Sequence, residues 1–310
     1  MMRILVTSVG SATGVNLIRG FQKVGDYVVG TDINPYGYTA GSCLANKFYQ
    51  IVLAEDKNYL SMLSDIIVAE KIDILIPIND IEIYEVAQEI DNISCHCIIP
   101  DVQTIEMIRD KYICNNKMKE IGIHVPETMY SVDNEKVILR NRFGVGSKGI
   151  EIIPKGVQIP IFNPDDKFLQ KFVDGEEYTV DVLADQNGNP VYIIPRKRLE
   201  VKSGVATKVS IENDFSLINS VKVILKHIKL PGFSNIQFIK DENGICWFVE
   251  INGRFSGCGA ATLSVCRNYL DEYKQIVRGK KDFQTINDQV KWNTIVTRYY
   301  EECIYENSIS

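Results

Sequence analysis

Short apolar runs alternate with amphipathic stretches over the first hundred residues of the chain. Residues 3–8 form a short run that contains apolar and β-branched side chains, a small-residue turn follows at 9–14, and helical spacing begins at 15–18. This order predicts a strand, a glycine-bearing turn and a helix. Further strands are expected at 27–31, 72–76 and 96–99, with a helix at 59–69. Strands that alternate with helices imply a parallel, doubly wound sheet.

The pattern changes after residue 101. A helical stretch covers 104–121, and strand-like segments then dominate. These strands are expected at 136–142, 149–154, 167–173, 177–184, 190–195, 233–241 and 245–251, with helices at 215–228 and 260–278. Turns rich in Asn and Gly at 185–189 and 241–244 favour hairpins and therefore antiparallel pairing. The second part of the chain is predicted to be α+β.

Composition places the chain among soluble globular proteins. Its 310 residues are 45% hydrophobic and 24% charged, and roughly 150 residues per domain suggests about two compact units. A net charge of −6 argues against nucleic acid and anionic membranes as partners. No apolar run approaches the ~20 residues that cross a bilayer. Eight scattered cysteines form no disulfide framework, so we expect a reducing cytoplasm.

The first glycine-bearing turn has two interpretations. It lies between a strand and a helix, and Asp32 follows where an acidic residue would meet a ribose hydroxyl, which favours a nicotinamide dinucleotide. Only Gly10 and Gly14 are present, however, so the three-glycine fingerprint is incomplete. A substrate carboxylate at the helix N-terminus is the second interpretation, because free N–H groups there attract anions.

A second glycine-rich segment, 144–149, lies between two predicted strands, unlike a P-loop. It contains Ser147 and Lys148, whose backbone amides and ammonium can close over phosphates as a lid. An exposed surface hairpin is the alternative.

The strongest pattern is a row of polar residues on one predicted strand. Alternate residues share a face, so Glu250, Asn252 and Arg254 should project together, while Val249 and Ile251 point to the core. Gln237 on the neighbouring strand can join them. A carboxylate and two amides suit the hard cation Mg²⁺. A half-buried polar strand face is the alternative.

Taken together, these segments resemble the ATP-grasp family, most closely its carbamoyl-phosphate synthase-like branch. The resemblance runs over nearly the whole chain and rests on the order of its motifs. These motifs are Asp-Ile-Asn-Pro at 32–35, Asp-Ile-Leu-Ile-Pro at 73–77, Asp-Lys at 110–111, Gly-Ser-Lys-Gly at 146–149, the segment 170–178, and Glu-Ile-Asn-Gly-Arg at 250–254. The resemblance implies a Rossmann-like pre-grasp domain at 1–108, a small lobe with the glycine-rich lid at 109–174, and a large lobe at 175–310.

The resemblance also implies an ATP site between the two lobes, with Mg²⁺, or alternatively Mn²⁺, as the metal. Phosphates would be bound by Lys111, Arg140, Ser147 and Lys148, adenine by the hinge of Gln170, Lys171, Phe172 and Val173, and ribose by Glu177. The metal ligands would be Gln237, Glu250 and Asn252. Arg254, Lys148 and Asn252 would serve phosphoryl transfer, and Arg254 would bind the γ-phosphate or an acyl phosphate.

Two features depart from the family pattern. Arg140-Asn141 stands where relatives usually have Lys-Pro, and the segments flanking the lid leave little room for helices, so we expect a reduced small lobe. Substrate contacts are expected from Gly10, Gly14, Asp80, Glu82, Arg196 and Arg198. The two arginines fit a solvated charged hairpin equally well.

We therefore expect an ATP-dependent ligase that activates a small carboxylic acid as an acyl phosphate and joins it to an amine or ammonia. An inactive nucleotide-binding module and an NAD(P)-binding oxidoreductase are the alternatives. We expect no nucleic-acid or membrane partner, and a homodimer stays open as the assembly.

Overall fold

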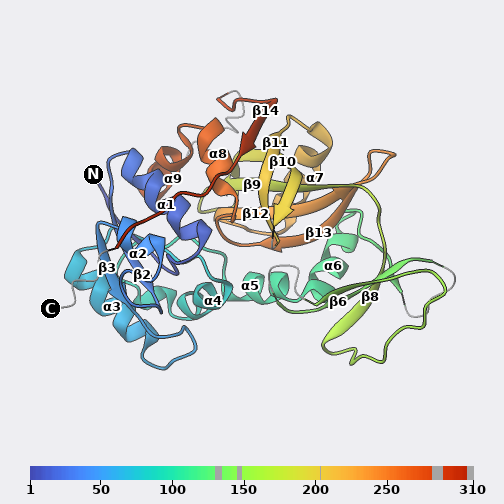
Figure 1. Ribbon diagram of the computed structural model, residues 1–310, viewed down its shortest axis with the longest axis horizontal. Coiled ribbons are helices and arrows are strands. Elements are labelled where there is room, and N and C mark those ends of the chain that lie inside the picture. Colours follow the sequence, from blue (N-terminus) through green and yellow to red (C-terminus); the bar gives the residue numbers. More distant parts are fainter. Residues whose placement is uncertain (130–134, 145–148, 203, 281–288, 306–310) are drawn as a thin grey trace.

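The computed structural model describes residues 1–129, 135–144, 149–202, 204–280 and 289–305. Its strands form three sheets. In Figure 1, the N-terminal sheet lies at the left, the largest sheet at the upper right, and a small sheet at the lower right. This mixed α/β architecture confirms the predicted fold class.

The N-terminal sheet is parallel, as its alternating pattern predicts. Its order is β3-β2-β1-β4. The strands are β1 (Arg3–Val6), β2 (Tyr27–Asp32), β3 (Lys47–Gln50) and β4 (Ile74–Ile76), and the helices are α1 (Ala12–Lys23), α2 (Ala40–Leu44), α3 (Tyr59–Glu70) and α4 (Asp80–Gln88), followed by the 3₁₀ turn η1 (Ile90–Asn92). The strand expected at 96–99 is wrong: His96 forms only an isolated bridge to Ile74.

The helix predicted over 104–121 is two helices, α5 (Val102–Arg109) and α6 (Lys111–Glu120). Asp110 separates them because its backbone is extended and its carboxylate accepts the N–H groups of Tyr112 and Ile113. A side chain that caps a new helix in this way ends the preceding one. Arg142 pairs with the same carboxylate, with 3.2 Å between Nε and Oδ1, which ties the start of α6 to the small sheet.

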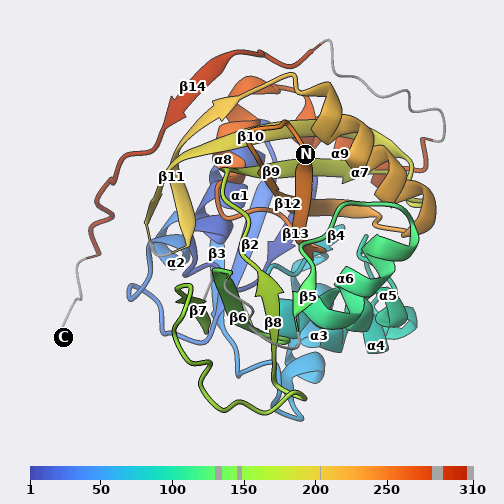
Figure 2. The ribbon, with the colours of Figure 1, turned by 90° about the vertical axis from the view of Figure 1, so that its right-hand side faces the viewer.

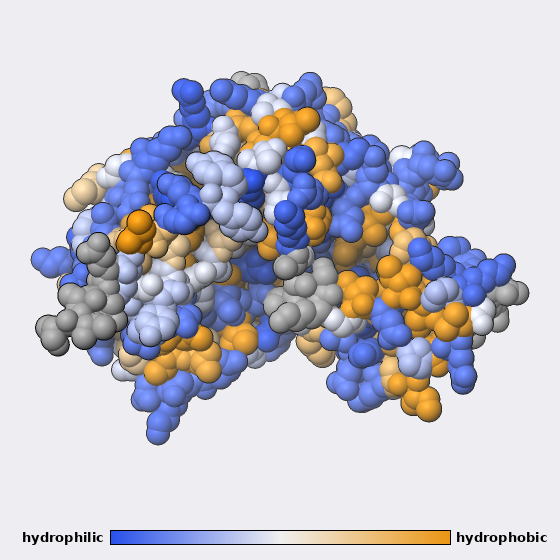
Figure 3. Space-filling model, viewed as in Figure 1, coloured by the Kyte–Doolittle hydropathy of each residue, from blue (hydrophilic) through white to orange (hydrophobic). Residues whose placement is uncertain are grey.

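The small sheet is antiparallel, in the order β5-β8-β6-β7. Its strands are β5 (Thr128–Met129), β6 (Val137–Asn141), β7 (Ile150–Ile153) and β8 (Lys167–Lys171). Within the described stretches 135–144 and 149–171 there is no helix, as expected for a reduced lobe. Ile150 and Ile152 are consequently about half exposed, and Figure 3 shows hydrophobic side chains on this lobe.

The largest sheet has the order β13-β12-β9-β10-β11-β14, and all its pairs are antiparallel. Its strands are β9 (Glu176–Ala184), β10 (Pro190–Lys202), β11 (Val205–Ile211), β12 (Gly232–Lys240), β13 (Cys246–Asn252) and β14 (Thr294–Thr297), and its helices are α7 (Phe215–His227), α8 (Gly259–Val265) and α9 (Tyr269–Val277). The single helix expected at 260–278 is therefore wrong, and β11 and β14 were not predicted. Figure 2 shows the small sheet beneath this large sheet.

A shared hydrophobic core holds the N-terminal sheet against the large sheet. One cluster contains Ile4 and Leu17 from the N-terminal part together with Tyr192, Phe233 and Tyr273 from the large-sheet part. Aromatic packing contributes, since the Phe233 and Tyr273 rings stack with centroids 4.3 Å apart. This core fixes the carboxyl ends of β1 and β4 relative to β13. In the described part of the chain, no helix has the length and apolar character needed to cross a bilayer.

Candidate functional site

A β-bulge on β13 determines which side chains share a face with the polar row, which consists of Gln237, Glu250, Asn252 and Arg254. Gln237 pairs with Glu250 and Phe238 with Phe248, so Val249 is an extra residue without a partner position on β12. Phe248 and Ile251 face the core, whereas Val249 is only half-buried. The prediction that Val249 points to the core is therefore wrong, because the extra residue shifts the alternation.

Hydrogen bonds join the members of the polar row. The Nε2 of Gln237 donates to Oε1 of Glu250 at 3.0 Å, and the Nδ2 of Asn252 donates to the same oxygen at 3.2 Å. Arg254 follows, with its Nη2 3.4 Å from Oδ1 of Asn252. The predicted ligand set is thus brought together around one carboxylate, with all its side chains partly exposed.

Arg140 reaches this carboxylate from the small sheet. Its Nη1 donates to Oε1 of Gln170 at 3.2 Å and to the carbonyl of Val249 at 3.4 Å, while Nη2 lies 3.9 Å from Oε2 of Glu250. Arg140 is 6% exposed, and its Nε has no hydrogen-bond partner among the described residues. Burial lowers the pKa of its guanidinium, and the Glu250 charge opposes that shift. A buried cation with an unused donor fits an additional anionic ligand.

Lys111 is a second cation at the same place. It begins α6, and its Nζ donates to the carbonyl of Gly144 at 2.6 Å. Burial lowers the pKa of Lys111; the charge of Glu250 raises it and that of Arg140 lowers it further. The two cations therefore crowd around one carboxylate, an arrangement that favours the arrival of further negative charge.

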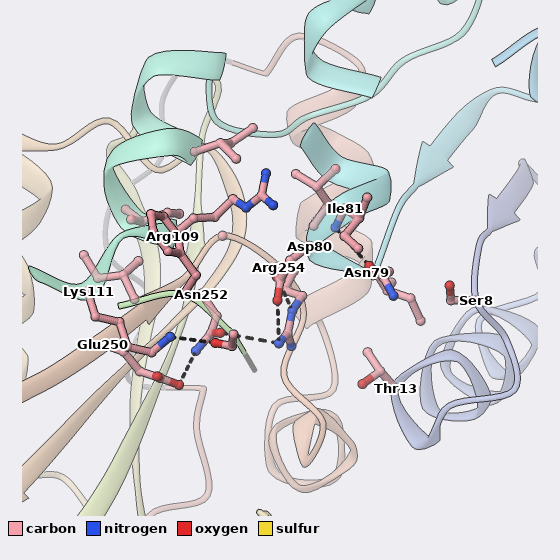
Figure 4. A pocket seen from close by; sticks show the side chains of 18 of the residues that line it. Ser8, Thr13, Asn79, Asp80, Ile81, Arg109, Lys111, Glu250, Asn252 and Arg254 are labelled. Atoms are coloured by element: carbon pink, nitrogen blue, oxygen red, sulfur yellow. Dashed lines mark hydrogen bonds and ion pairs between the residues drawn. The ribbon is translucent and has the colours of Figure 1, made fainter. Parts of the chain in front are cut away.

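A cavity of about 440 Å³ opens beside the row. Asp80, at the start of α4, and Arg254 both line it and are in direct contact, with 2.7 Å between Oδ1 of Asp80 and Nε of Arg254 (Figure 4). An aliphatic wall and three hydroxyl side chains also line the cavity: Ile78, Ile81, Ile83, Ile105 and Ile108, and Ser8, Ser11 and Thr13. None of these was predicted. For Ser8, Ser11, Thr13, Ile78, Ile81 and Ile83, the signal in the sequence was their position after strands β1 and β4, where open α/β sheets bind ligands. Ile105 and Ile108 come from α5 and carried no such signal.

A second cavity of about 180 Å³ lies on the other side of Asn252 and Arg254 and is lined by Arg196 and Arg198. Arg196 is fully buried, and its Nε and Nη2 donate to Asp181 at 2.7 and 2.8 Å. Burial lowers the pKa of Arg196, but the charge and hydrogen bonds of Asp181 outweigh that effect and leave the pKa raised. The solvated-hairpin interpretation is therefore wrong for Arg196. Arg198 donates to Oε2 of Glu177 at 2.8 Å, so the predicted ribose ligand Glu177 already has a cationic partner at the edge of this cavity.

Several hydrogen-bonding groups of the predicted adenine hinge are already used within the protein. The backbone N–H groups of Lys171 and Phe172 donate to the carbonyls of Glu127 and Lys136 at 2.8 and 3.1 Å. The Gln170 side chain donates to the Pro126 carbonyl at 3.2 Å and holds Arg140. Binding of adenine through the backbone would therefore fall to Val173 unless these bonds break. Ser147 and Lys148 of the lid lie outside the described residues.

The N-terminal glycine turn is satisfied internally. The N–H of Gly10 donates to Oδ2 of Asp32 at 2.7 Å, and Oδ1 of Asp32 accepts the N–H and side-chain amide of Asn34. A Cβ on Gly14 would lie 2.5 Å from Cα of Val9, so packing requires this glycine. Neither glycine lines the two cavities just described, and Asp32 already accepts three hydrogen bonds, which leaves at most one acceptor site for a ribose.

Glu82 also has a structural role. It completes the capping box of α4 with Asn79, and Oε2 accepts the hydroxyl of Thr7 at 2.5 Å. Burial raises the pKa of its carboxyl group, and these hydrogen bonds lower it in part. The expected substrate contact thus falls to Asp80, while Glu82 holds the helix that carries it.

Among the described residues, no group of three His, Cys, Asp or Glu side chains is placed to hold a metal ion. The candidate ligand set does not require one, because it combines a single carboxylate with two amides. Such oxygen donors leave positions for water and phosphate, which is the coordination that Mg²⁺ prefers.

Two family models match parts of this chain. Residues 163–298 match "ATP-grasp in the biosynthetic pathway with Ter operon", and residues 4–99 match the PylC-like N-terminal domain. The first match contains β13 and its polar row. A comparison with curated protein sequences finds no match.

Solved structures share the fold at low identity. N5-carboxyaminoimidazole synthetase from Staphylococcus aureus, complexed with ADP, is 18% identical with a TM-score of 0.70, over 91% of this chain and 78% of that chain. The biotin carboxylase domain of 2-oxoglutarate carboxylase from Hydrogenobacter thermophilus, in complex with MgADP, ADP and bicarbonate, is 17% identical with a TM-score of 0.71, over 94% and 73%. Biotin carboxylase from Campylobacter jejuni is 14% identical with a TM-score of 0.69, over 94% and 74%.

Proposed function

Because this chain is an ATP-grasp protein, we propose that it is an ATP- and Mg²⁺-dependent carboxylate–amine ligase that forms an amide through an acyl phosphate. One observation carries the proposal. Glu250, Gln237 and Asn252 converge on β12 and β13, and Arg140 approaches Glu250 from the small sheet. Lys111 lines the same cavity as Glu250 and Asn252. Positive and negative side chains from α6, the small sheet and the large sheet meet here. This arrangement suits a ligand that carries both charges, such as a triphosphate bound to a metal ion.

Gln237, Glu250 and Asn252 would hold the metal ion, and Mn²⁺ has the same ligand preference. When bound, Mg²⁺ neutralises negative charge that develops on the phosphates. The phosphate chain would lie beside this metal ion. Buried Arg140 has an Nε donor there that the described residues leave unused, and Lys111, whose pKa burial lowers, is a second cation that a phosphate would stabilise. Asn252 and Arg254 would continue this line to the γ-phosphate. Ser147 and Lys148, which lie outside the described residues, are retained as proposed phosphate ligands.

Nucleoside recognition is proposed at the edge of the small sheet. Gln170, Lys171, Phe172 and Val173 would border the adenine, with Val173 the residue whose backbone N–H is not engaged in the bonds described above. Glu177 would bind the ribose hydroxyls after exchanging its Arg198 partner, from which it is 2.8 Å away. Glu177 is about half exposed, so this exchange costs little.

The two cavities suggest where the two substrates bind. The smaller cavity is rich in arginine and suits a small carboxylic acid close to Arg196, Arg198 and Arg254. The larger cavity combines aliphatic side chains with Asp80 and suits an amine that carries an apolar portion, or ammonia. They meet at Asn252 and Arg254, where the acyl group would have to pass from phosphate to amine.

The chemistry requires positioning and charge neutralisation. A carboxylate oxygen of the acid attacks the γ-phosphorus, the bond to the ADP oxygen breaks, and the amine then displaces phosphate from the acyl carbon and loses a proton. Arg254 would spread the developing charge, while the pairing of buried Arg140 with partly exposed Glu250 would orient the row. The sequence offers no obvious covalent nucleophile, and none is needed for this route.

The alternatives differ in their support. The oxidoreductase needs the Gly10 turn, where Asp32 is already occupied by Gly10 and Asn34. The inactive module keeps the nucleotide site without turnover. We also retain as proposals the division into 1–108, 109–174 and 175–310, a cytoplasmic location, and a homodimeric assembly.

An acid-by-amine screen with Mg²⁺ and ATP, reading both ADP and phosphate, tests the proposal. ADP formation that requires one acid and one amine is the expected result. Binding of MgATP without turnover for any pair would indicate the inactive module. Binding of NADH without binding of MgATP would overturn the ligase and leave the oxidoreductase.

A further inference from the structure

Asp80 and Arg254 form an ion pair between two parts of the molecule that are 174 residues apart in sequence. Nε of Arg254 donates to Oδ1 of Asp80 at 2.7 Å, and Nη2 lies 3.4 Å from Oδ2. The two side chains are 22% and 19% exposed. The carboxylate therefore faces one whole edge of the guanidinium, inside the larger cavity (Figure 4).

The start of α4 does not need the Asp80 carboxylate. Asn79 accepts the N–H of Ile81 at 2.9 Å, and Glu82 accepts the N–H of Asn79 at 3.3 Å, which completes the capping box. The Asp80 side chain is consequently turned away from its own helix and toward Arg254. Its position is fixed by a rigid helix start and is not a consequence of local capping.

Arg254 has a second set of contacts on the nucleotide side. Its Nη2 lies 3.4 Å from Oδ1 of Asn252, whose amide in turn donates to Glu250. The Nε and Nη2 edge is thus shared between Asp80 and the polar row. A guanidinium offers bidentate contact along one edge to one oxyanion at a time. A phosphoryl group that takes this edge must displace Asp80.

We propose that Asp80 is a positioning residue that competes with the γ-phosphoryl group for Arg254, so that arrival of the triphosphate breaks the contact between the N-terminal part and the polar row. The proposal rests on the proposed function, because it requires a nucleotide at β13. It assigns Asp80 a role in the binding of ATP as opposed to ADP. The aspartate opposes a ligand that carries the terminal phosphate and is indifferent to one that lacks it.

Calorimetric titration of the full chain with two probes tests this competition. The probes are the Mg²⁺ complexes of a non-hydrolysable ATP analogue, AMP-PNP, and of ADP. In Asp80→Asn, we expect AMP-PNP to bind about fivefold more tightly, since a partly exposed pair is worth up to about that factor. We expect the affinity for ADP to stay within about twofold of wild type. Asp91→Asn, which removes the same charge from the exposed turn η1, is the matched control and should change neither affinity.

A double-mutant cycle shows whether the effect passes through Arg254. In an Arg254→Gln background, Asp80→Asn should no longer change the affinity for AMP-PNP. A gain that persists there, an equal gain for ADP, or weaker binding of AMP-PNP to Asp80→Asn would overturn the proposal. If Asp80→Asn melts well below wild type, Asp80→Ser replaces it in the same cycle. Failure of wild type to bind either nucleotide would instead refute the proposed function.

Discussion

Two polar regions of this chain carry similar sequence signals and have different physical roles. The turn at Gly10 and the row at Glu250 both combine small or polar residues with a carboxylate on a strand. At the turn, Asp32 accepts hydrogen bonds from its own neighbourhood, at Gly10 and Asn34. At the row, Glu250 receives groups from β12, β13 and the small sheet.

The difference shows what separates a structural polar cluster from a candidate site. Asp32 already accepts three hydrogen bonds from Gly10 and Asn34, which leaves it little capacity for a ligand. Arg140, in contrast, is buried with its Nε unused by the described residues, and Lys111 is held near it with a lowered pKa. A buried donor without a hydrogen-bond partner among the described residues, next to a carboxylate that lines a cavity, is the feature that points to a ligand.

The largest expected effect is a loss of turnover when Glu250 in the polar row is replaced. Glu250→Gln keeps the shape and one oxygen but removes the charge that Arg140 faces and that the proposed metal ion would need. We expect the rate of ADP formation, with the acid and amine found by the screen, to fall by about 10²-fold or more. Glu151→Gln on β7, whose side chain is exposed, should keep the wild-type rate. An equal rate in both variants would contradict the role of Glu250.

A substitution in the Gly10 turn should lower the stability of the protein and leave its affinity for nucleotide unchanged. Asp32→Asn leaves one of the hydrogen-bonded N–H groups without an acceptor, so we expect a loss of about 1–3 kcal/mol in the free energy of unfolding. Denaturant titration measures this loss. The affinity for MgATP should stay within about twofold of wild type. A change in NADH affinity with unchanged stability would mean that the turn is a dinucleotide site.

Lys111 predicts a pH dependence of nucleotide affinity. Burial lowers its pKa below the ordinary lysine value of 10.5, so the ammonium loses its proton, and its attraction for phosphate, before an exposed lysine would. MgADP affinity should fall as pH rises through that lowered pKa, by about tenfold at the upper limit. Lys111→Arg should move the fall to higher pH. A profile that is identical in both proteins would exclude Lys111 as a phosphate ligand.

The same lowered pKa has a consequence for folding. Between the folded pKa of Lys111 and 10.5 the unfolded chain binds more protons than the folded chain, so this residue makes the unliganded protein more stable as pH rises through that window. Melting of wild type and Lys111→Met across this range measures the contribution. The opposite slope would contradict the burial of the ammonium.

The smallest effect is expected at Glu82. Glu82→Gln retains a side-chain oxygen for the capping box and removes a carboxyl group whose pKa burial raises. Turnover should therefore stay within about twofold of wild type. A large rise in the Michaelis constant for the amine, with an unchanged melting temperature, would restore the substrate contact originally expected of Glu82.

The arrangement of strands could be predicted from the sequence where the alternation of apolar and polar residues continues without interruption along a strand. The parallel sheet, the hairpins at Asp185 and Asp241, and the shared face of Glu250 and Asn252 follow from alternation and turn residues. The bulge at Val249 could not be predicted, because it is set by pairing with β12. Asp110, in turn, breaks a continuous helical pattern through a cap that competes with the helix interior.

Side-chain partners were harder to predict than faces. Arg198 and Glu177 pair across neighbouring strands, and Arg254 meets Asp80 over 174 positions. Such contacts depend on how the sheets pack, and the shared core that sets this packing is spread over the whole chain. The hydroxyl residues and isoleucines of the larger cavity were missed for the same reason, since each is an ordinary residue until the fold places them together.

Thermal melting with defined ligands tests the central claim most directly. We expect Mg²⁺ with ATP to raise the melting temperature of wild type, and Glu250→Gln to lose most of that shift while keeping its unliganded melting temperature. NADH should leave both proteins unchanged. A shift with NADH alone, or a full MgATP shift in Glu250→Gln, would contradict the claim that the row on β13 binds the metal–nucleotide complex.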